Sequence, residues 1–284
     1  MRKAAQEAFC VGFIRDVRAI DPGIGGLKLW VMYMREFPET ARIGRDRFCE
    51  IVDRHGFKLR RRSRKPKTTD SRHGFEKTPN LARDFIPTAI NQLWVSDITY
   101  IKIWDGAGNC EFAYLTLIMD AYSREILGWD LSRSLGRKGT IRALNQAIQR
   151  LEGIPAESAR QLIHHSDRGI QYACDEYRLL LESRGMRRSM TENGDPKENA
   201  QAERVNSTIK NELLMGRTFR SLEEAGYAIE KAVDFYNTRR PHMSSDMLPP
   251  KEAAALTGHM DKRWHSYREE AIRKNKESEI AANP

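Results

Sequence analysis

The sequence has few of the features that mark secreted or membrane proteins. Its 284 residues include only four cysteines, Cys10, Cys49, Cys110 and Cys174, and none has the spacing of a CxxC pair or of a disulfide framework. No apolar run approaches the roughly 20 residues that a membrane-spanning helix needs, and the first ten residues are too polar for a signal peptide. We therefore expect reduced thiols, a cytoplasmic location and no membrane partner.

Acidic residues are also in deficit. Against 39 Asp and Glu stand 48 Lys and Arg, and the net charge is +9. A basic balance of this size indicates a polyanionic partner, and nucleic acid is the usual one. A soluble protein that happens to be basic is the alternative on charge alone, because charge reports on partners and not on fold. Hydrophobic residues still make up 40% of the chain, so a sizeable core can form.

Residues 1–57 are expected to form a small helical region. Apolar residues recur at helical spacing from Leu27 to Phe37, and Pro38 ends that helix. A second helix is expected over residues 45–55. Two short helices around a tight break in a basic chain suggest a helix-turn-helix reader of DNA. Ordinary core packing of the two helices is the alternative.

Residues 58–86 are expected to form an exposed basic linker. Within them, the run 58–75 holds eight Lys or Arg against one acid and almost no apolar residues, so it cannot bury a core. It is either a solvated tether or a strap along DNA phosphates, where each neutralised phosphate releases counterions. We favour the strap. Its candidate DNA-binding residues are Arg60, Arg61, Arg62, Arg64, Lys65 and Lys67.

Residues 87–245 predict an α/β domain, and residues 246–284 a helical C-terminal tail. Alternating segments rich in β-branched and aromatic residues, bounded by turn residues, predict strands, and periodic apolar residues predict helices. Strands are expected over 93–103, 111–120, 125–131, 161–166 and 186–190, and helices over 139–151, 175–184, 200–214 and 222–237. The first three strands form an antiparallel meander, and the alternation that follows predicts a mixed five-stranded sheet with flanking helices. Such an order is compatible with a ribonuclease-H-like fold.

Three acids of this domain are candidates for one site. Asp97 lies inside an otherwise apolar strand, where a charge is costly unless it is paired. Asp167 follows the end of a strand, and Glu203 lies one turn into the helix that begins near Ala200. Two carboxylates 4 Å apart repel by about 4 kcal/mol at an effective dielectric of about 20. Mg²⁺, which prefers hard oxygen ligands, would reverse that repulsion, and two ions roughly 3.5–4 Å apart would support phosphoryl transfer.

Four segments of the chain resemble signature segments of the DDE transposases. Three of them contain the acids: W-V-S-D-I-T-Y, H-H-S-D-R-G-I-Q-Y and N-A-Q-A-E-R-V-N-S-T-I-K-N-E. The interval between Asp167 and Glu203 contains 35 residues, the spacing of the group with a retroviral-integrase-like catalytic core. The fourth, Y-N-T-R-R-P-H at residues 236–242, is similar to a segment of the insertion sequence three family. The chain looks like the product of that family's second reading frame, over nearly its whole length.

The resemblance implies a transposase whose catalytic and metal-binding residues are Asp97, Asp167 and Glu203. It implies two Mg²⁺ ions, for which Mn²⁺ can substitute, cleavage at terminal inverted repeats and strand transfer into target DNA. Because two ends must be brought together, a homodimer or larger assembly on DNA is expected, and the protein of an upstream reading frame is a further candidate partner. Lys210, seven residues after Glu203, is implied to grip the terminal DNA. The alternative is an exposed helix lysine.

Other acids compete with the three. Asp120 ends a strand and begins the turn D-A-Y-S-R, so a turn role is expected for it. Asp195 and Glu198 lie in the polar loop before the helix that carries Glu203, and similar proteins usually have aspartate at position 198. From the sequence, only the position of Glu203 within a helix, with Lys210 on the same face, separates it from Glu198.

Several aromatic residues near the acids also need an interpretation. His164 and His165 are adjacent in a strand and point to opposite faces, so we expect one to pack and the other to border the site. His242 either packs or positions DNA or a water. Trp94 and Tyr100 are expected in the core rather than as groups that stack on bases. The cysteines and histidines lack the spacing of the retroviral integrase zinc module, so no zinc is expected.

Two other functions stay open at this point. One is a catalytically inactive, transposase-derived protein that only binds DNA, although such decay would be expected to remove one of the acids. The other is a nuclease of similar fold that cleaves without joining. The helical region and the basic strap favour a protein that holds specific DNA ends.

Overall fold

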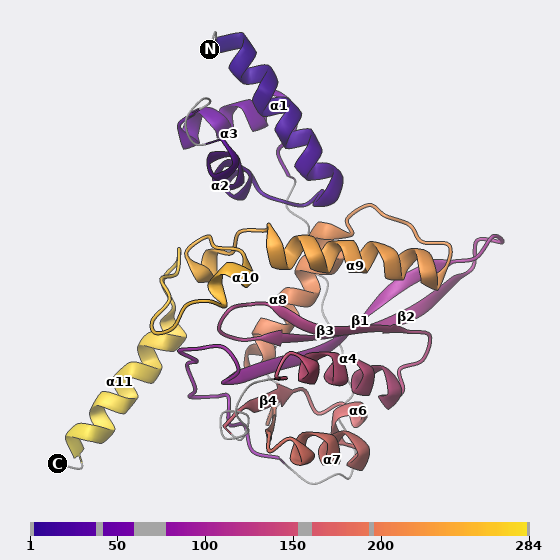
Figure 1. The fold of residues 1–284 in the computed structure, drawn as a ribbon, viewed down its shortest axis with the longest axis vertical. Coiled ribbons are helices and arrows are strands. Elements are labelled where there is room, and N and C mark those ends of the chain that lie inside the picture. The colour runs from indigo at the N-terminus through magenta and orange to yellow at the C-terminus, as the bar shows by residue number, and fades with distance from the viewer. Residues whose placement is uncertain (1–2, 38–41, 60–77, 153–160, 193–195, 283–284) are drawn as a thin grey trace.

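The computed structural model describes residues 3–37, 42–59, 78–152, 161–192 and 196–282. Three helices at the N-terminus gather above the main domain in Figure 1: α1 (Lys3–Ile20), α2 (Gly26–Glu36) and α3 (Arg45–Arg54). Their apolar faces meet around Tyr33, whose ring lies edge-on to Phe13 at 5.3 Å and tilted against Phe48 at 5.4 Å. The two helices expected here are α2 and α3. Residues 37–44 separate them, a longer connection than the three- or four-residue turn of a helix-turn-helix.

The main domain is built on a mixed five-stranded sheet, as predicted. Its strands are β1 (Leu93–Trp104), β2 (Cys110–Asp120), β3 (Ile126–Ser132), β4 (Ile163–Ser166) and β5 (Arg187–Met190). Their order is β3-β2-β1-β4-β5. The first three strands pair antiparallel, whereas β4 pairs parallel with both β1 and β5. The predicted meander and the edge position of the last strand are confirmed.

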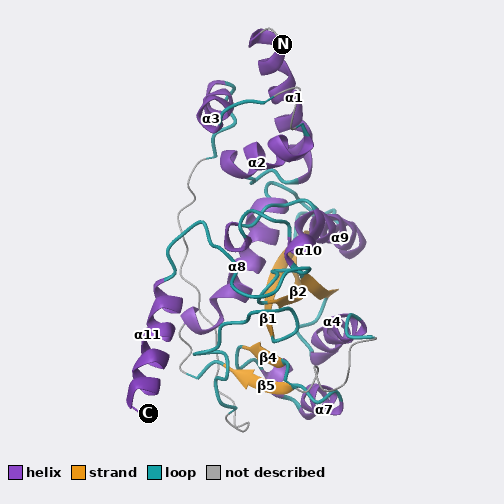
Figure 2. Ribbon diagram, turned by 60° about the vertical axis from the view of Figure 1, so that its left-hand side comes forward, coloured by secondary structure: helices purple, strands orange, loops and turns teal. Residues whose placement is uncertain are grey.

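Helices cover both faces of the sheet (Figures 1 and 2). On one face lie α4 (Arg137–Gln149), α6 (Ile170–Ala173) and α7 (Asp175–Ser183), and on the other α8 (Ala200–Thr208) and α9 (Leu222–Thr238). Alternate residues of β1 enter the two cores: Trp94 is buried with α4 and α7, and Val95 with α8 and α9. Gly128 lets α4 approach β3, because a Cβ there would lie 2.1 Å from the carbonyl oxygen of Ala143.

The helix that begins at Ala200 changes its winding before it ends. Beyond Thr208 it continues as a π-helical segment, η2 (Ile209–Leu213), where a regular α-helix was expected to about residue 214. The amide of Leu214 bonds to the carbonyl of Ile209 at 2.9 Å, and both side chains are buried. Apolar spacing cannot reveal this change, because both windings bury these side chains. Short π segments are frequent at functional sites.

Residues 246–284 contain the helices α10 (Pro250–Ala253) and α11 (Tyr267–Ala282). The short helical turns η1 (Pro196–Asn199) and η3 (Met243–Ser245) precede them. Arg268 anchors α11 by donating to the carbonyl oxygens of Ala82 at 2.8 Å and Arg83 at 2.7 Å. In the described part of the chain, no helix combines the length and apolar character needed to cross a bilayer.

Candidate active site

Asp97 and Asp167 stand at the same level of the sheet. β1 and β4 run parallel, and Ser96 pairs with Ser166 in their register. The next residue on each chain is therefore one of the two predicted acids. β4 ends at Ser166, so Asp167 begins the loop after the strand, while β1 continues to Trp104. Carboxyl ends of parallel strands are where a sheet presents side chains to a site.

Two amide side chains tie α8 to β1 beside Asp97. Asn206 donates from Nδ2 to Oδ2 of Asp97 at 2.9 Å, and Asp97 is only 5% exposed. Asn199, at the start of the helix, donates from Nδ2 to the carbonyl oxygen of Ser96 at 3.0 Å. These bonds hold the helix across the strand at two points about two helical turns apart. Neither asparagine was singled out from the sequence, because each contact joins residues more than 100 positions apart.

Glu203 lies between these two anchors. It follows Asn199 by four residues and precedes Asn206 by three, and residues at these spacings share one face of a helix. The face of α8 that carries Glu203 is therefore the face that touches Ser96 and Asp97. Glu203 is half-buried. The third predicted acid thus comes from a helix that is fixed to the strand of the first.

The loop after β4 has its own supports. The backbone amide of Gly169 donates to Oδ1 of Asp167 at 3.0 Å, and the hydroxyl of Tyr172 is hydrogen-bonded to Oγ of Ser96 at 2.9 Å. Burial first, and then neighbouring groups that include Asp167 and Asp97, raise the pKa of Tyr172 well above its ordinary value. Both aspartates therefore act on one buried phenol, which stays protonated across the physiological range.

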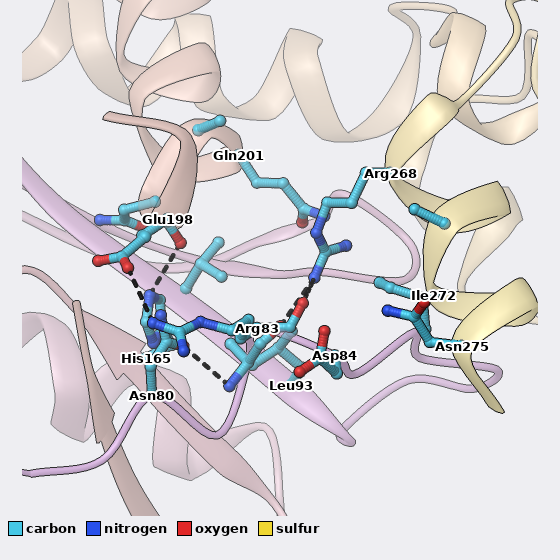
Figure 3. Close-up of a pocket in the computed structure, with 15 residues that line it drawn as sticks. Asn80, Arg83, Asp84, Leu93, His165, Glu198, Gln201, Arg268, Ile272 and Asn275 are labelled. Atoms are coloured by element: carbon cyan, nitrogen blue, oxygen red, sulfur yellow. Dashed lines mark hydrogen bonds and ion pairs between the residues drawn. The ribbon is translucent and has the colours of Figure 1, made fainter. Parts of the chain in front are cut away.

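Glu198 has a structural task that separates it from Glu203. One carboxylate oxygen accepts from the amide of Glu192 at 2.7 Å, and the other lies 3.4 Å from the guanidinium of Arg83. Its backbone carbonyl is hydrogen-bonded to Nε2 of His165 at 3.0 Å (Figure 3). Glu198 thereby ties Glu192 and His165 to the residues just before α8. Asp195, the other competing acid, lies outside the described residues.

The remaining competitors have packing or turn roles. Asp120 accepts backbone hydrogen bonds from Asn91, Tyr122 and Ser123 at 2.8–3.0 Å, which confirms its turn role. His242 is buried edge-on against Tyr236, with ring centroids 4.6 Å apart, and burial holds its pKa well below the ordinary value. Of the two roles left open for His242, the structure supports packing.

His164 and His165 point to opposite faces, as predicted. His164 is hydrogen-bonded to the hydroxyl of Tyr177 at 3.0 Å, and burial lowers its pKa to about 3. His165 is hydrogen-bonded through Nδ1 to Ser189 at 2.8 Å, and burial lowers its pKa to about 4. Both rings are therefore neutral at pH 7. His165 borders a cavity of about 330 Å³ between the start of α8 and α11, next to Val95 on the Asp97 face of β1.

Lys210 and Tyr100 are in contact. The Nζ atom of Lys210 lies 3.5 Å from the ring centroid of Tyr100. Trp94 is fully buried, as expected, but the core position expected for Tyr100 is wrong, because its side chain is 51% exposed. Tyr100 lies on the same face of β1 as Trp94, near the end of the strand away from the core formed by α4 and α7. Strand alternation predicts which face of the sheet a side chain is on, but it does not predict whether a helix covers that part of the face.

Residues 236–242 contact β3, the N-terminal helical region and the π segment η2. Asn237 clamps the start of β3, accepting from the amide of Ile126 and donating to its carbonyl, both at 2.9 Å. Arg240 is 1% exposed and donates from Nε to Asp21 at 3.1 Å. It also pairs with Glu212 of the π segment. Arg240 therefore links the N-terminal helices to the helix that carries Glu203.

The donor set suits a hard divalent cation. Asp97, Asp167 and Glu203 all offer carboxylate oxygens, the ligands that Mg²⁺ prefers. Two of them stand at one level of the sheet and the third on the adjoining helix face. Among the residues that the structure describes, no three His, Cys, Asp or Glu side chains are already grouped closely enough to hold an ion. The six strap residues, Arg60, Arg61, Arg62, Arg64, Lys65 and Lys67, lie outside the described residues.

The sequence matches known protein families and is similar to known transposases. Residues 87–196 and 184–250 match families described as Integrase core domain. The chain is 33% identical, over 245 residues and 85% of either chain, to the putative transposase for insertion sequence element IS986/IS6110 of Mycobacterium tuberculosis (strain CDC 1551 / Oshkosh). It is 31% identical over 229 residues to the transposase for insertion sequence element IS629 of Shigella sonnei, covering 81% of this chain and 73% of that one.

Among solved structures, the chain is similar to one from the simian T-cell lymphotropic virus intasome in complex with PP2A regulatory subunit B56 gamma. The TM-score is 0.50 at 16% identity, over 70% of this chain and 65% of that chain. At this identity the likeness is one of fold. It agrees with the predicted ribonuclease-H-like sheet and its flanking helices.

Proposed function

Since this chain belongs to the DDE transposases of the insertion sequence three family, whose core is an integrase core domain, we propose that it cuts DNA at the ends of its element and joins them to target DNA. The arrangement of β1, β4 and α8 supports this most directly. The register of the two strands aligns Asp97 with Asp167, and the two asparagine contacts turn the Glu203 face of α8 toward them.

In this proposal Asp97, Asp167 and Glu203 hold Mg²⁺, and two ions are expected because phosphoryl transfer needs both an activated nucleophile and a stabilised leaving oxygen. When bound, Mg²⁺ supplies charge stabilisation for the phosphate and lowers the pKa of a bound water. The protein's own contribution is position. Asn206 fixes the rotamer of Asp97, and Gly169 that of Asp167. Holding donors and DNA in place before reaction removes much of the entropic cost of the displacement.

Two displacements at phosphorus make up the proposed reaction. In the first, water attacks a phosphodiester at the element's end, one P–O bond forms, another breaks, and a 3′-hydroxyl is released. In the second, this hydroxyl attacks a target phosphodiester in line, and the target strand leaves as a 3′-hydroxyl. Each step exchanges one P–O bond for another, so strand transfer needs no external energy source. Because two ends must be joined, we propose at least a dimer on DNA.

Metal removal tests the reaction class. The full chain is incubated with a labelled duplex of the element's own end, taken from flanking genomic DNA, and with supercoiled plasmid as target. We expect cleavage and joining with Mg²⁺, loss of both with EDTA, and recovery on adding Mg²⁺ or Mn²⁺. Cleavage that persists in EDTA would contradict the metal requirement. Cleavage without any joined product would instead identify a nuclease.

Lys210 is proposed to contact DNA phosphate beside the acids, with the basic strap as a second contact. Lys210→Ala should weaken end binding and lower the slope of log affinity against log salt by about one, the effect of losing one phosphate contact. Lys231→Ala is the matched control, because Lys231 lies 4.3 Å over the ring of Tyr227 in a similar cation–π pair on α9. Binding is measured by fluorescence anisotropy at several salt concentrations. An unchanged slope for Lys210→Ala would make it an ordinary surface lysine.

A further inference from the structure

An exposed pair of aromatic rings lies on β1 and β2, further along β1 than Asp97. Tyr100 is 51% exposed and Phe112 47%, and their rings meet edge-on with centroids 5.1 Å apart. In the antiparallel register Tyr100 pairs with Tyr114 and Lys102 pairs with Phe112. Tyr100 and Phe112 are therefore diagonal neighbours on one face of the strand pair. Adjacent half-exposed aromatic rings on a protein surface are typical of a binding site.

Lysines accompany these rings. Lys210 holds its Nζ atom 3.5 Å from the centroid of Tyr100, and Lys102 on the same strand face lies 6.0 Å from the ring of Trp104. The acid nearest to Phe112 in sequence, Glu111, points to the opposite strand face, 3.7 Å from Arg133. Aromatic rings interleaved with positive charges suit a ligand that has flat bases and phosphates, because bases stack on rings and phosphates pair with lysines.

The position of the pair relates it to the acids. Tyr100 follows Asp97 by three residues of strand, about 10 Å at 3.3 Å per residue, and alternation points the two side chains to opposite faces of β1. Lys210 follows Glu203 by seven residues of helix, also about 10 Å at 1.5 Å per residue. The contact between Lys210 and Tyr100 therefore brings the helix that carries Glu203 to the strand that carries Asp97 at this ring. A span of about 10 Å is covered by about three nucleotides at 3.4 Å each.

We propose that Tyr100 and Phe112 form a stacking platform for an unpaired base of the DNA end, about three nucleotides from the cleaved bond. This rests on the proposed function, because the platform would act on the same DNA. The occupant is a nucleotide out of the duplex, since a paired base has both faces covered by its neighbours. Lys210 covers one face of Tyr100 in the free protein and releases it on moving to a phosphate. Stacking of a base is the stronger contact, so the exchange is favourable.

The test compares two end duplexes that differ in pairing. One is fully paired, and in the other the three nucleotides beside the cleavage position are unpaired and one carries 2-aminopurine, whose fluorescence falls on stacking. We expect the parent to bind the unpaired end about 10-fold more tightly, with quenching of the probe. Tyr100→Ala should lose both the preference and the quenching, and Tyr100→Phe should keep them. Tyr227→Ala, at an exposed tyrosine with a lysine over its ring, is the matched control and should behave as the parent.

The outcomes separate the platform from the proposed function. If the parent cuts the paired end but prefers neither substrate, or if Tyr100→Ala keeps the preference, the platform is overturned while the transposase function stands. If the parent neither binds nor cuts either end with Mg²⁺, the proposed function fails first. Sedimentation of the same variants tests whether a second copy of the chain binds at Tyr100 and Phe112 instead. If Tyr100→Ala loses self-association but keeps the preference for the unpaired end, the two rings form a contact between copies and the platform is overturned.

Discussion

Replacing Glu203 with glutamine is expected to slow cleavage of the element's end by about 1,000-fold, which corresponds to about 4 kcal/mol of transition-state stabilisation. Glutamine keeps the shape of the side chain but removes the charge that would hold a cation. Because Asn199 and Asn206 position α8 through their own amides, the helix should keep its place in the variant. DNA binding should therefore persist. Cleavage is followed on a labelled end duplex with Mg²⁺, and binding by anisotropy on the same duplex.

Glu198→Gln is the matched control for this prediction. Both residues are glutamates near the start of α8, but Glu198 accepts from the amide of Glu192 and lies 3.4 Å from Arg83. A glutamine oxygen can still accept from that amide, and the exposed Arg83 contributes at most about 1 kcal/mol through the lost charge. We expect cleavage within a few-fold of the parent. If Glu198→Gln were inactive and Glu203→Gln active, the third acid would be Glu198.

The roles of Glu198 and Glu203 could not be separated securely from the sequence, whereas the strands and the three acids could be predicted from it. The five strands were predictable because alternation and turn residues are local signals, and the three acids could be chosen because their surrounding segments resemble a known family. Glu203 and Glu198 differ instead in contacts made by distant residues. Arg83 meets Glu198 across 115 positions, and Asn206 meets Asp97 across 109. Spacing along the chain contains no information about such pairs.

Tyr100 and the π segment were mispredicted for related reasons. Tyr100 was expected in the core because alternation places it on the same face as Trp94, but its place near the end of the strand leaves it half-exposed. The change from a regular α-helix to a π-helix at Ile209 could not be predicted, because Leu213 and Leu214 are apolar residues that either winding would bury. In both places the apolar pattern predicts correctly which face the side chain is on. It does not predict how far neighbouring elements cover Tyr100, or how the backbone winds after Thr208.

The largest effect on stability is expected at Arg240. Its guanidinium is almost fully buried and pairs with Asp21, from the loop after α1, and with Glu212, from the π segment. The amide of Gly23 donates to the carbonyl of Glu212 at 3.1 Å, so backbone and side chains meet at one junction. Removing one partner of a buried ion pair leaves an uncompensated charge, which costs about 3–5 kcal/mol. Arg240→Ala should lower the free energy of unfolding by this amount, measured by urea denaturation.

Arg239→Ala is the control, because Arg239 also reaches the N-terminal helices. Its partner is Glu36 at 3.4 Å, but both side chains are about half exposed, and such pairs contribute at most about 1 kcal/mol. The two adjacent arginines thus both form ion pairs with the N-terminal helical region, but only the pair of Arg240 with Asp21 is buried. Equal losses for Arg239→Ala and Arg240→Ala would show that burial at the junction does not matter.

The loss at Arg240 should also depend on pH, with a sign set by the groups around it. Burial raises the pKa of Asp21 while Arg240 opposes the rise, and burial and then Arg240 lower the pKa of Lys28 to about 7. Without Arg240 both groups bind protons more readily in the folded state, so the variant gains stability relative to the parent as pH falls. The deficit should be largest near pH 9 and smaller at pH 5.5. A deficit that grows on acidification would contradict the effect on the protonation of Asp21 and Lys28 that is assigned here to Arg240.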